Sequence, residues 1–174
     1  MSPTTTSTMN GTETATTTQV FRVYIRSTAE KIWEAITSPE WNQQYGYHCP
    51  AEYELRAGGA YRAFTTDQMR EMGLPEVGVE GEVLEVDPPH RLVQTWRFNF
   101  SPEAIAEGFT TVTWEIHPES DGLCRLTVSH DVTDAPLMAH DTRGDGELGE
   151  GGGGWPFILS DLKSLLETGT SLEL

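Results

Sequence analysis

The 174-residue sequence is poor in cysteine, poor in basic residues and free of long hydrophobic runs. With only Cys49 and Cys124, a disulfide scaffold is not indicated, and reduced thiols in the cytoplasm are the expectation. No apolar run approaches the roughly 20 residues that span a bilayer. The N-terminus lacks the basic and apolar regions of a signal peptide. These absences predict a cytoplasmic protein without a membrane anchor.

The charge is strongly one-sided. Eleven Lys and Arg residues face 27 Asp and Glu residues, which gives a formal net charge of −16. Because nucleic acids and anionic lipid surfaces carry dense negative charge, both are excluded as expected partners. No metal-ligand spacing and no phosphate-binding glycine loop is present, so no metal and no cofactor is expected.

The first 18 residues are mostly Thr and Ser. Such a composition buries too little apolar surface to offset the entropy of ordering, so a disordered tail is predicted over 1–18. The remaining residues, 19–174, suit one domain with a sizeable core. A second polar stretch, 131–154, is rich in Gly, Asp and Glu, and it predicts a long mobile loop.

The folded part begins with an alternating segment, "VFRVYI", that predicts a strand. Ser27 and Glu30 have the spacing of a capping box, so a helix is expected to start there. Ser38 followed by Pro39 predicts a second, short helix.

Six more strands are expected in three pairs. "AEYELRAGGAYRAFTT" predicts a hairpin that turns at Gly58-Gly59, and "GVEGEVLEVDPPHRLVQTWRFNF" predicts two long strands with a bulge in the first. "TTVTWEIHPESDGLCRLTVSHDV" alternates clearly, with Trp114, Leu126, Val128 and His130 among the residues on its apolar face. Short connections predict antiparallel pairing.

The chain closes with an amphipathic helix after a run of four glycines. Its apolar stripe holds Trp155, Ile158, Leu159, Leu162, Leu165 and Leu166, and the opposite face holds Ser160, Asp161, Lys163, Ser164 and Glu167. Gly169 fits the helix end. The glycine run is interpreted as a flexible hinge. The order of elements predicts an α+β fold in which a curved antiparallel sheet of about seven strands wraps around this helix and leaves a cavity.

Five blocks in this order resemble the family named after the activator of the Hsp90 ATPase: "STAEKIWEAITSPEWNQQYG", "LRAGGAYR", "GEVLEVDPPHRLVQTW", "VTWEIHPESDGLCRLTVSHD" and "GGWPFILSDLKSLLETG". The resemblance covers roughly residues 20–169. It implies the START-like, birch-pollen-allergen-like (SRPBCC) helix-grip fold. That superfamily includes lipid carriers, polyketide cyclases and aromatases, hormone receptors and co-chaperone domains, so the resemblance leaves the function open.

The candidate ligand-binding residues lie on the inner wall and at the expected cavity mouth. They are Trp96, Phe98, Trp114, Leu126, Val128, His130, Trp155, Leu159 and Leu162 on the wall, and Tyr45, Tyr47 and His48 at the mouth. Each indole is interpreted either as a stacking surface for a planar ligand or as plain core. His130 is the first candidate for a general acid or base, against the alternative of a core histidine with satisfied hydrogen bonds.

Three functions follow as hypotheses. The leading one is non-enzymatic binding of a small, largely apolar or aromatic molecule by a monomer or homodimer. The second is an enzyme of the cyclase, aromatase or dehydratase type that uses His130. The third is a co-chaperone-like protein-interaction domain, which a fully packed interior with an exposed apolar patch would favour.

Overall fold

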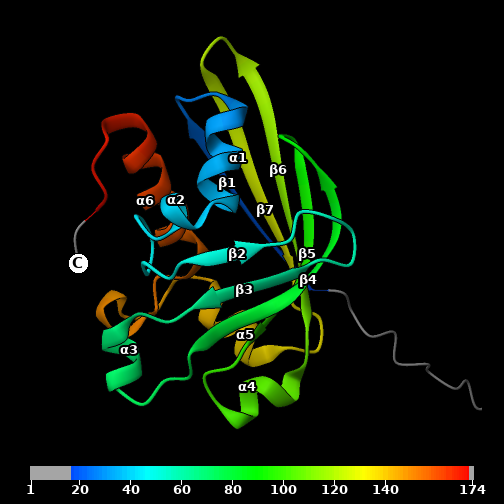
Figure 1. The fold of residues 1–174 in the computed structure, drawn as a ribbon, viewed down its shortest axis with the longest axis vertical. Coiled ribbons are helices and arrows are strands. Elements are labelled where there is room, and N and C mark those ends of the chain that lie inside the picture. The colour runs from blue at the N-terminus through cyan, green and yellow to red at the C-terminus, as the bar shows by residue number, and fades with distance from the viewer. Residues whose placement is uncertain (1–16, 173–174) are drawn as a thin grey trace, which may run out of the picture.

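The computed structural model describes residues 17–172, and Figure 1 shows their arrangement. The strands are β1 (Thr18–Ile25), β2 (Ala51–Tyr53), β3 (Ala60–Phe64), β4 (Val77–Asp87), β5 (Arg91–Phe98), β6 (Thr110–Ser120) and β7 (Leu123–Asp131). The helices are α1 (Ala29–Thr37), α2 (Pro39–Asn42), α3 (Asp67–Glu71), α4 (Pro102–Glu107), α5 (Pro136–Thr142), the 3-10 turn η1 (Leu148–Glu150) and α6 (Gly154–Thr168). The predicted disordered tail lies outside the described residues up to residue 16, and β1 already begins at Thr18.

One antiparallel sheet holds all seven strands in the order β1-β7-β6-β5-β4-β3-β2. The predicted hairpins are confirmed, since β2 pairs with β3, β4 with β5, and β6 with β7. The bulge expected in the fourth strand is found as a register shift between Val83 and Glu85. Within residues 17–172, no helix is long and apolar enough to cross a membrane.

The helix α6 packs on the sheet beside β1 and α1, so the predicted α+β helix-grip fold is confirmed (Figure 1). The apolar side chains of β6 and β7 that were predicted to share a face are buried, and Thr113, Glu115 and Arg125 lie on the other face. The inner face of the sheet and the apolar stripe of α6 together form the core.

Two local predictions about the helices are wrong. The N-cap of α1 is Thr28, whose hydroxyl accepts a hydrogen bond from the Lys31 amide at 3.3 Å, so the cap lies one residue after the expected Ser27. Asp161, placed by its helical position on the polar face of α6, is completely buried. Its carboxylate finds backbone donors in two other segments of the chain, which helical periodicity does not reveal.

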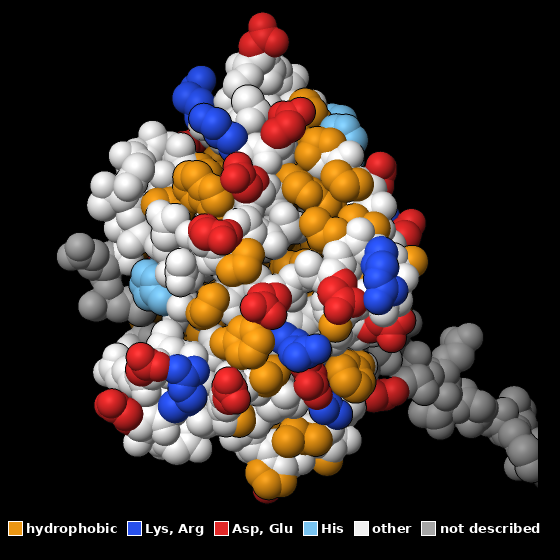
Figure 2. Space-filling model, in the orientation of Figure 1, with side chains coloured by type: hydrophobic (Ala, Val, Ile, Leu, Met, Phe, Trp, Pro, Cys, Tyr) orange, Lys and Arg blue, Asp and Glu red, His pale blue; other side chains and the backbone are white. Residues whose placement is uncertain are grey.

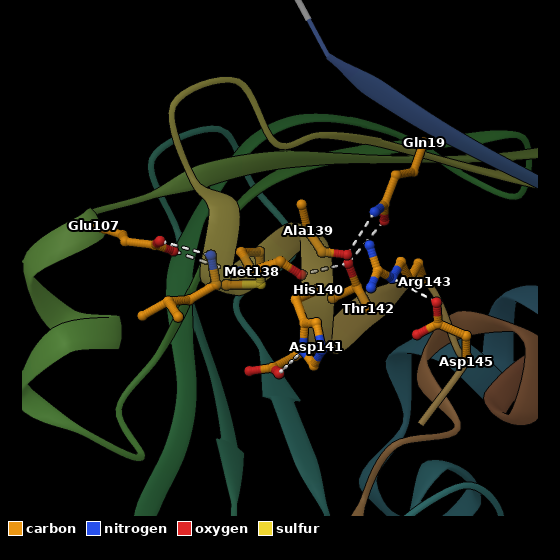
Figure 3. A network of polar contacts seen from close by, with 10 residues as sticks. Gln19, Glu107, Met138, Ala139, His140, Asp141, Thr142, Arg143 and Asp145 are labelled. Atoms are coloured by element: carbon orange, nitrogen blue, oxygen red, sulfur yellow. Dashed lines mark hydrogen bonds and ion pairs between the residues drawn. The ribbon is translucent and has the colours of Figure 1, made fainter. Parts of the chain in front are cut away.

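The acidic stretch 131–154 is also not the predicted loop, because it contains α5 and η1. Figure 3 shows what fixes α5. The Glu107 carboxylate accepts hydrogen bonds from the Leu137 and Met138 amides at 2.7 and 3.1 Å, and the Gln19 side chain bonds to Ala139 and Thr142. These partners come from α4 and β1, so the helix depends on long-range contacts that its own composition does not predict.

Part of the glycine run before α6 is closely packed. Gly154 has a φ of +55°, and a Cβ there would overlap the carbonyl oxygen of Thr142. The Gly153 carbonyl oxygen in turn lies close to Gly144, where a Cβ would be 2.5 Å from it. Glycine is therefore required for packing at Gly144 and Gly154, whereas Gly151 has open space around it, and the flexible hinge stays a prediction.

Candidate ligand-binding site

A continuous row of aromatic rings fills the space between the sheet and α6. It runs from Tyr53 to Tyr61, Trp96, Trp155 and Trp114, with successive ring centroids 4.6, 5.4, 5.2 and 5.2 Å apart. Four of the rings come from β2, β3, β5 and β6, and the fifth comes from the first turn of α6. The alternation of each strand points its ring inward, so the row follows from the sheet register. We call these five residues the aromatic row.

One end of the aromatic row reaches the surface. Tyr53 is half-buried, and it lines an open groove of about 330 Å³ at the β2 edge together with residues of α1, α2 and β3. The other pronounced hollow, about 340 Å³, lies along β3, β4 and β5 and is lined by Arg62, Glu80 and Phe109 among others. Neither of these two grooves lies between the sheet and α6, so the cavity predicted there stays a prediction.

The Tyr53 hydroxyl, at the groove end of the aromatic row, is hydrogen-bonded to a core residue. Tyr53 donates a hydrogen bond to Gln94 Oε1 at 2.8 Å, and Trp114 Nε1 donates to the same oxygen at 3.1 Å. Burial raises the pKa of both Tyr53 and Tyr61 above the ordinary tyrosine value. Both hydroxyls are therefore protonated at neutral pH and act as hydrogen-bond donors.

His130 is fully buried beside the aromatic row, and both of its ring nitrogens have partners. Trp155 Nε1 donates to His130 Nδ1 at 3.1 Å. Thr110 donates its hydroxyl hydrogen to the Trp96 carbonyl at 3.0 Å, so the 2.7 Å contact with His130 Nε2 is a donation from the imidazole. The ring is thus the neutral Nε2–H tautomer. Burial lowers its pKa to about 4, against a small opposing effect of Asp131. In this state it has no lone pair or proton free for a substrate.

This environment gives a pH prediction. The pKa of His130 falls from 6.5 in the unfolded chain to about 4 in the folded protein. The unfolded chain therefore takes up a proton first as the pH drops, so stability present above pH 6.5 is lost between pH 6.5 and 4. At 1.36 kcal/mol per pKa unit, the loss is about 3 kcal/mol. Urea unfolding across this range measures it. An NMR titration of the His130 ring with a midpoint at 6.5 or above would contradict it.

The residues predicted at the cavity mouth do not gather there. Tyr45 is buried, and its hydroxyl donates to the Ala35 carbonyl at 2.9 Å. Tyr47 packs its ring on Phe157 and accepts a hydrogen bond from the Gly153 amide at 3.0 Å. His48 is exposed, with Nδ1 at 2.9 Å from the Gln43 carbonyl. The Tyr47 contacts hold the α2–β2 loop against the start of α6, and the role of the three residues in ligand binding stays a prediction.

The predicted wall residues do lie together on the inner side. Trp96, Trp114 and Trp155 form part of the aromatic row, and Phe98 extends it with its ring 6.3 Å from Trp96. Further residues are buried in the core around the row, namely Leu126, Val128, Leu159 and Leu162. The sequence analysis missed Tyr53, Tyr61, Thr110 and Gln94. The signal for Gln94 was available, because it shares the inward face of β5 with Trp96.

The outer face of the sheet carries the charged groups. Arg97 pairs with Glu80 and lies with its guanidinium carbon 4.5 Å from the ring centroid of Phe109. Cys49 and Cys124 are free thiols, and burial raises the pKa of Cys49 to about 11, so it is not an activated nucleophile. Across residues 17–172, no three His, Cys, Asp or Glu side chains come close enough to hold a metal ion.

Comparison with solved structures supports the fold. CalU16 from Micromonospora echinospora aligns over 88% of this chain and 78% of its own, with a TM-score of 0.60 and 19% identity. An Hsp90 activator from Plasmodium falciparum, PFC0360w, aligns over 85% of this chain and 86% of its own, with a TM-score of 0.53 and 20% identity. DynU16, described as a putative protein in the dynemicin biosynthetic locus, aligns over 88% of this chain but 48% of its own, with a TM-score of 0.58 and 21% identity.

No curated protein matches the sequence. The family model described as "Activator of Hsp90 ATPase homolog 1-like protein" matches residues 26–167, which run from the end of β1 into the last turn of α6. On this match and on the helix-grip architecture that carries it, the chain belongs to the family of proteins similar to the activator of Hsp90 ATPase.

Proposed function

We propose that the protein binds a small, planar and largely apolar molecule between the sheet and α6, without catalysis. The observation that carries the proposal is the aromatic row, which starts at Tyr53 in a surface groove and continues into the interior. Flat apolar molecules stack on such rings, and a groove of about 330 Å³ matches the size of small-ligand sites. The proposal keeps Trp96, Trp114 and Trp155 as contact residues.

In this proposal, the ligand enters from the groove by parting the rings. Tyr53 and Tyr61 separate the groove from Trp96, and their movement opens the route. Because binding then needs an open form that is a minor part of the population, association is slow and the apparent affinity is reduced by that population. A cytoplasmic location is part of the proposal, and it is supported by the two unpaired thiols.

An enzymatic role for His130 is less well supported, because both of its nitrogens are already bonded to Trp155 and Thr110. A protein-interaction role is favoured by one observation. Large apolar side chains are exposed around α4 and the adjacent start of α5, namely Phe100, Ile105, Phe109 and Leu137. Figure 2 shows hydrophobic side chains at the lower end of the molecule, where Figure 1 places α4. This is the second candidate function.

A panel of flat apolar compounds, such as flavonoids and phenolic polyketides, tests the proposal. Saturation at 100 times Kd stabilises the folded state by about 2.7 kcal/mol, which raises Tm by about 5–10 °C for a chain of this size. The same compounds are expected to quench tryptophan emission. Differential scanning fluorimetry and emission titrations measure both effects.

The matched variants are Trp114→Phe, within the aromatic row, and Trp33→Phe, on α1 outside it. The first is expected to reduce the quenching, and the second to leave it unchanged. If the panel changes neither Tm nor emission, the small-molecule proposal is wrong and the apolar surface around α4 becomes the leading candidate site.

A further inference from the structure

Among the described residues, two N–H donors on the inward face of β5 have no hydrogen-bond partner, Gln94 Nε2 and Trp96 Nε1. Both residues lie on the inward face of β5, two positions apart, and their side chains are 0% and 8% exposed. An unpaired buried donor is destabilising, so native proteins seldom keep one without a reason. Here two such donors are neighbours within the proposed binding region.

The orientation of the Gln94 amide is fixed by its neighbours. An indole N–H only donates, and Trp114 directs its N–H at one end of the amide. That end must be the oxygen, which also accepts from Tyr53. The NH₂ group consequently points away from both partners, and rotating the amide would set two donors against each other.

Among the described residues, Arg97 Nε and Asn99 Oδ1 also lack a hydrogen-bond partner, but the other two indole N–H groups of the aromatic row are satisfied. Of the three indoles in the aromatic row, Trp114 donates to Gln94 and Trp155 donates to His130. Trp96 alone among them has a free N–H. The nearby Thr110 hydroxyl is already occupied, since it takes the His130 hydrogen and gives its own to the Trp96 carbonyl. The group that would satisfy Gln94 Nε2 and Trp96 Nε1 is an acceptor.

We infer that the ligand supplies this acceptor, as a neutral carbonyl oxygen on a planar aromatic skeleton that receives the N–H groups of Gln94 and Trp96. This inference rests on the proposed function. A carboxylate or phosphate is disfavoured because no cation faces the site: Arg97 is paired with Glu80 on the outer face, Arg62 is exposed there, and His130 is neutral. The Tyr61 ring, stacked on Trp96 with 24° between the planes, marks the plane that the ligand skeleton takes.

The test uses two probes with one tricyclic skeleton, fluorene and 9-fluorenone, which differ by the carbonyl oxygen. Equilibrium dialysis against the full-length protein measures both dissociation constants. Fluorenone is expected to bind at least about tenfold more tightly, since its oxygen pairs buried donors that fluorene leaves unpaired. The infrared carbonyl stretch of bound fluorenone is expected at a lower frequency than in an apolar solvent, because two N–H groups donate to it.

Trp96→Phe removes one of the two donors and keeps an aromatic ring, so it is expected to reduce the preference for fluorenone while fluorene affinity is retained. Trp33→Phe, on α1 outside the aromatic row, is the matched control, and the preference for fluorenone should persist. The infrared shift in the wild-type protein decides the question even where a variant fails to fold. Equal affinity for both probes with an unshifted carbonyl stretch overturns the inference and leaves the proposed function standing. Failure of both probes to bind counts against the proposed function itself.

Discussion

Leu162→Ala is expected to destabilise the protein by about 2–5 kcal/mol, the range for truncating a large buried aliphatic side chain. Leu162 lies at the centre of α6, is fully buried and belongs to the core formed with the sheet. The truncation removes apolar contacts on the side of the helix that faces the strands, and the packed interior has little freedom to collapse into the space. Urea unfolding followed by far-ultraviolet circular dichroism measures the change.

Ser160→Ala on the same helix is the matched control. Ser160 is exposed, and its hydroxyl only bonds to the Pro156 carbonyl one turn earlier. A change within about 0.5 kcal/mol is expected, as for most surface substitutions. Ser164 is a poorer control because its hydroxyl donates to the Thr170 carbonyl beyond the helix end. Similar small effects of Leu162→Ala and Ser160→Ala would show that α6 is not docked on the sheet.

The elements with a clear period could be predicted from the sequence. Alternation placed Trp114 and Leu126 on the inner face, and the 3.6-residue period placed Leu162 on the buried stripe of α6, as the structure has them. Turn residues such as Gly58-Gly59 then determined which strands pair. Local pattern suffices in these cases because burial on one face is a property of a single element.

The features that periodicity missed depend on partners distant in the chain. The helix α5 is capped by Glu107, about 30 residues earlier, and tied to β1 through Gln19. Tyr45 is buried, and its hydroxyl reaches the Ala35 carbonyl inside the fold. In each case a hydrogen bond across the fold sets the position of the side chain.

In the candidate site, too, local periodicity predicts some residues, and others depend on distant partners. The sequence analysis found three of the five rings in the aromatic row, but not Tyr53 and Tyr61, whose strands are only three and five residues long. The sequence analysis did not identify the unpaired donors. Whether Gln94 and Trp96 lack partners depends on which groups Trp114, Trp155 and His130 bond to, and that follows only from the register of β5, β6 and β7.

Asp161 shows most clearly how the structure differs from what helical periodicity predicts. A helical wheel places it with the polar residues of α6, where replacing it would have little effect. In the structure its side chain is 0% exposed, and the carboxylate joins three segments. Oδ2 accepts from the Gly46 amide at 2.8 Å and Oδ1 from the Leu172 amide at 2.5 Å, so it ties the α2–β2 loop and the C-terminal segment to the helix.

Asp161→Ala is therefore expected to cost about 2–4 kcal/mol, since hydrogen bonds to charged groups contribute about 1.5–3 kcal/mol each and water replaces the bond to Leu172 more readily than the buried bond to Gly46. Glu167→Ala is the matched control, a carboxylate on the same helix that accepts from the Arg26 amide and Lys163 at the surface. Its loss is expected to stay within about 1 kcal/mol.

Amide hydrogen exchange adds a local readout, because the Gly46 amide loses its acceptor in Asp161→Ala and should exchange faster, while the Glu167 variant leaves it protected. A neutral effect of Asp161→Ala together with an unchanged Gly46 amide would mean that the carboxylate faces solvent, as the helical wheel alone suggests.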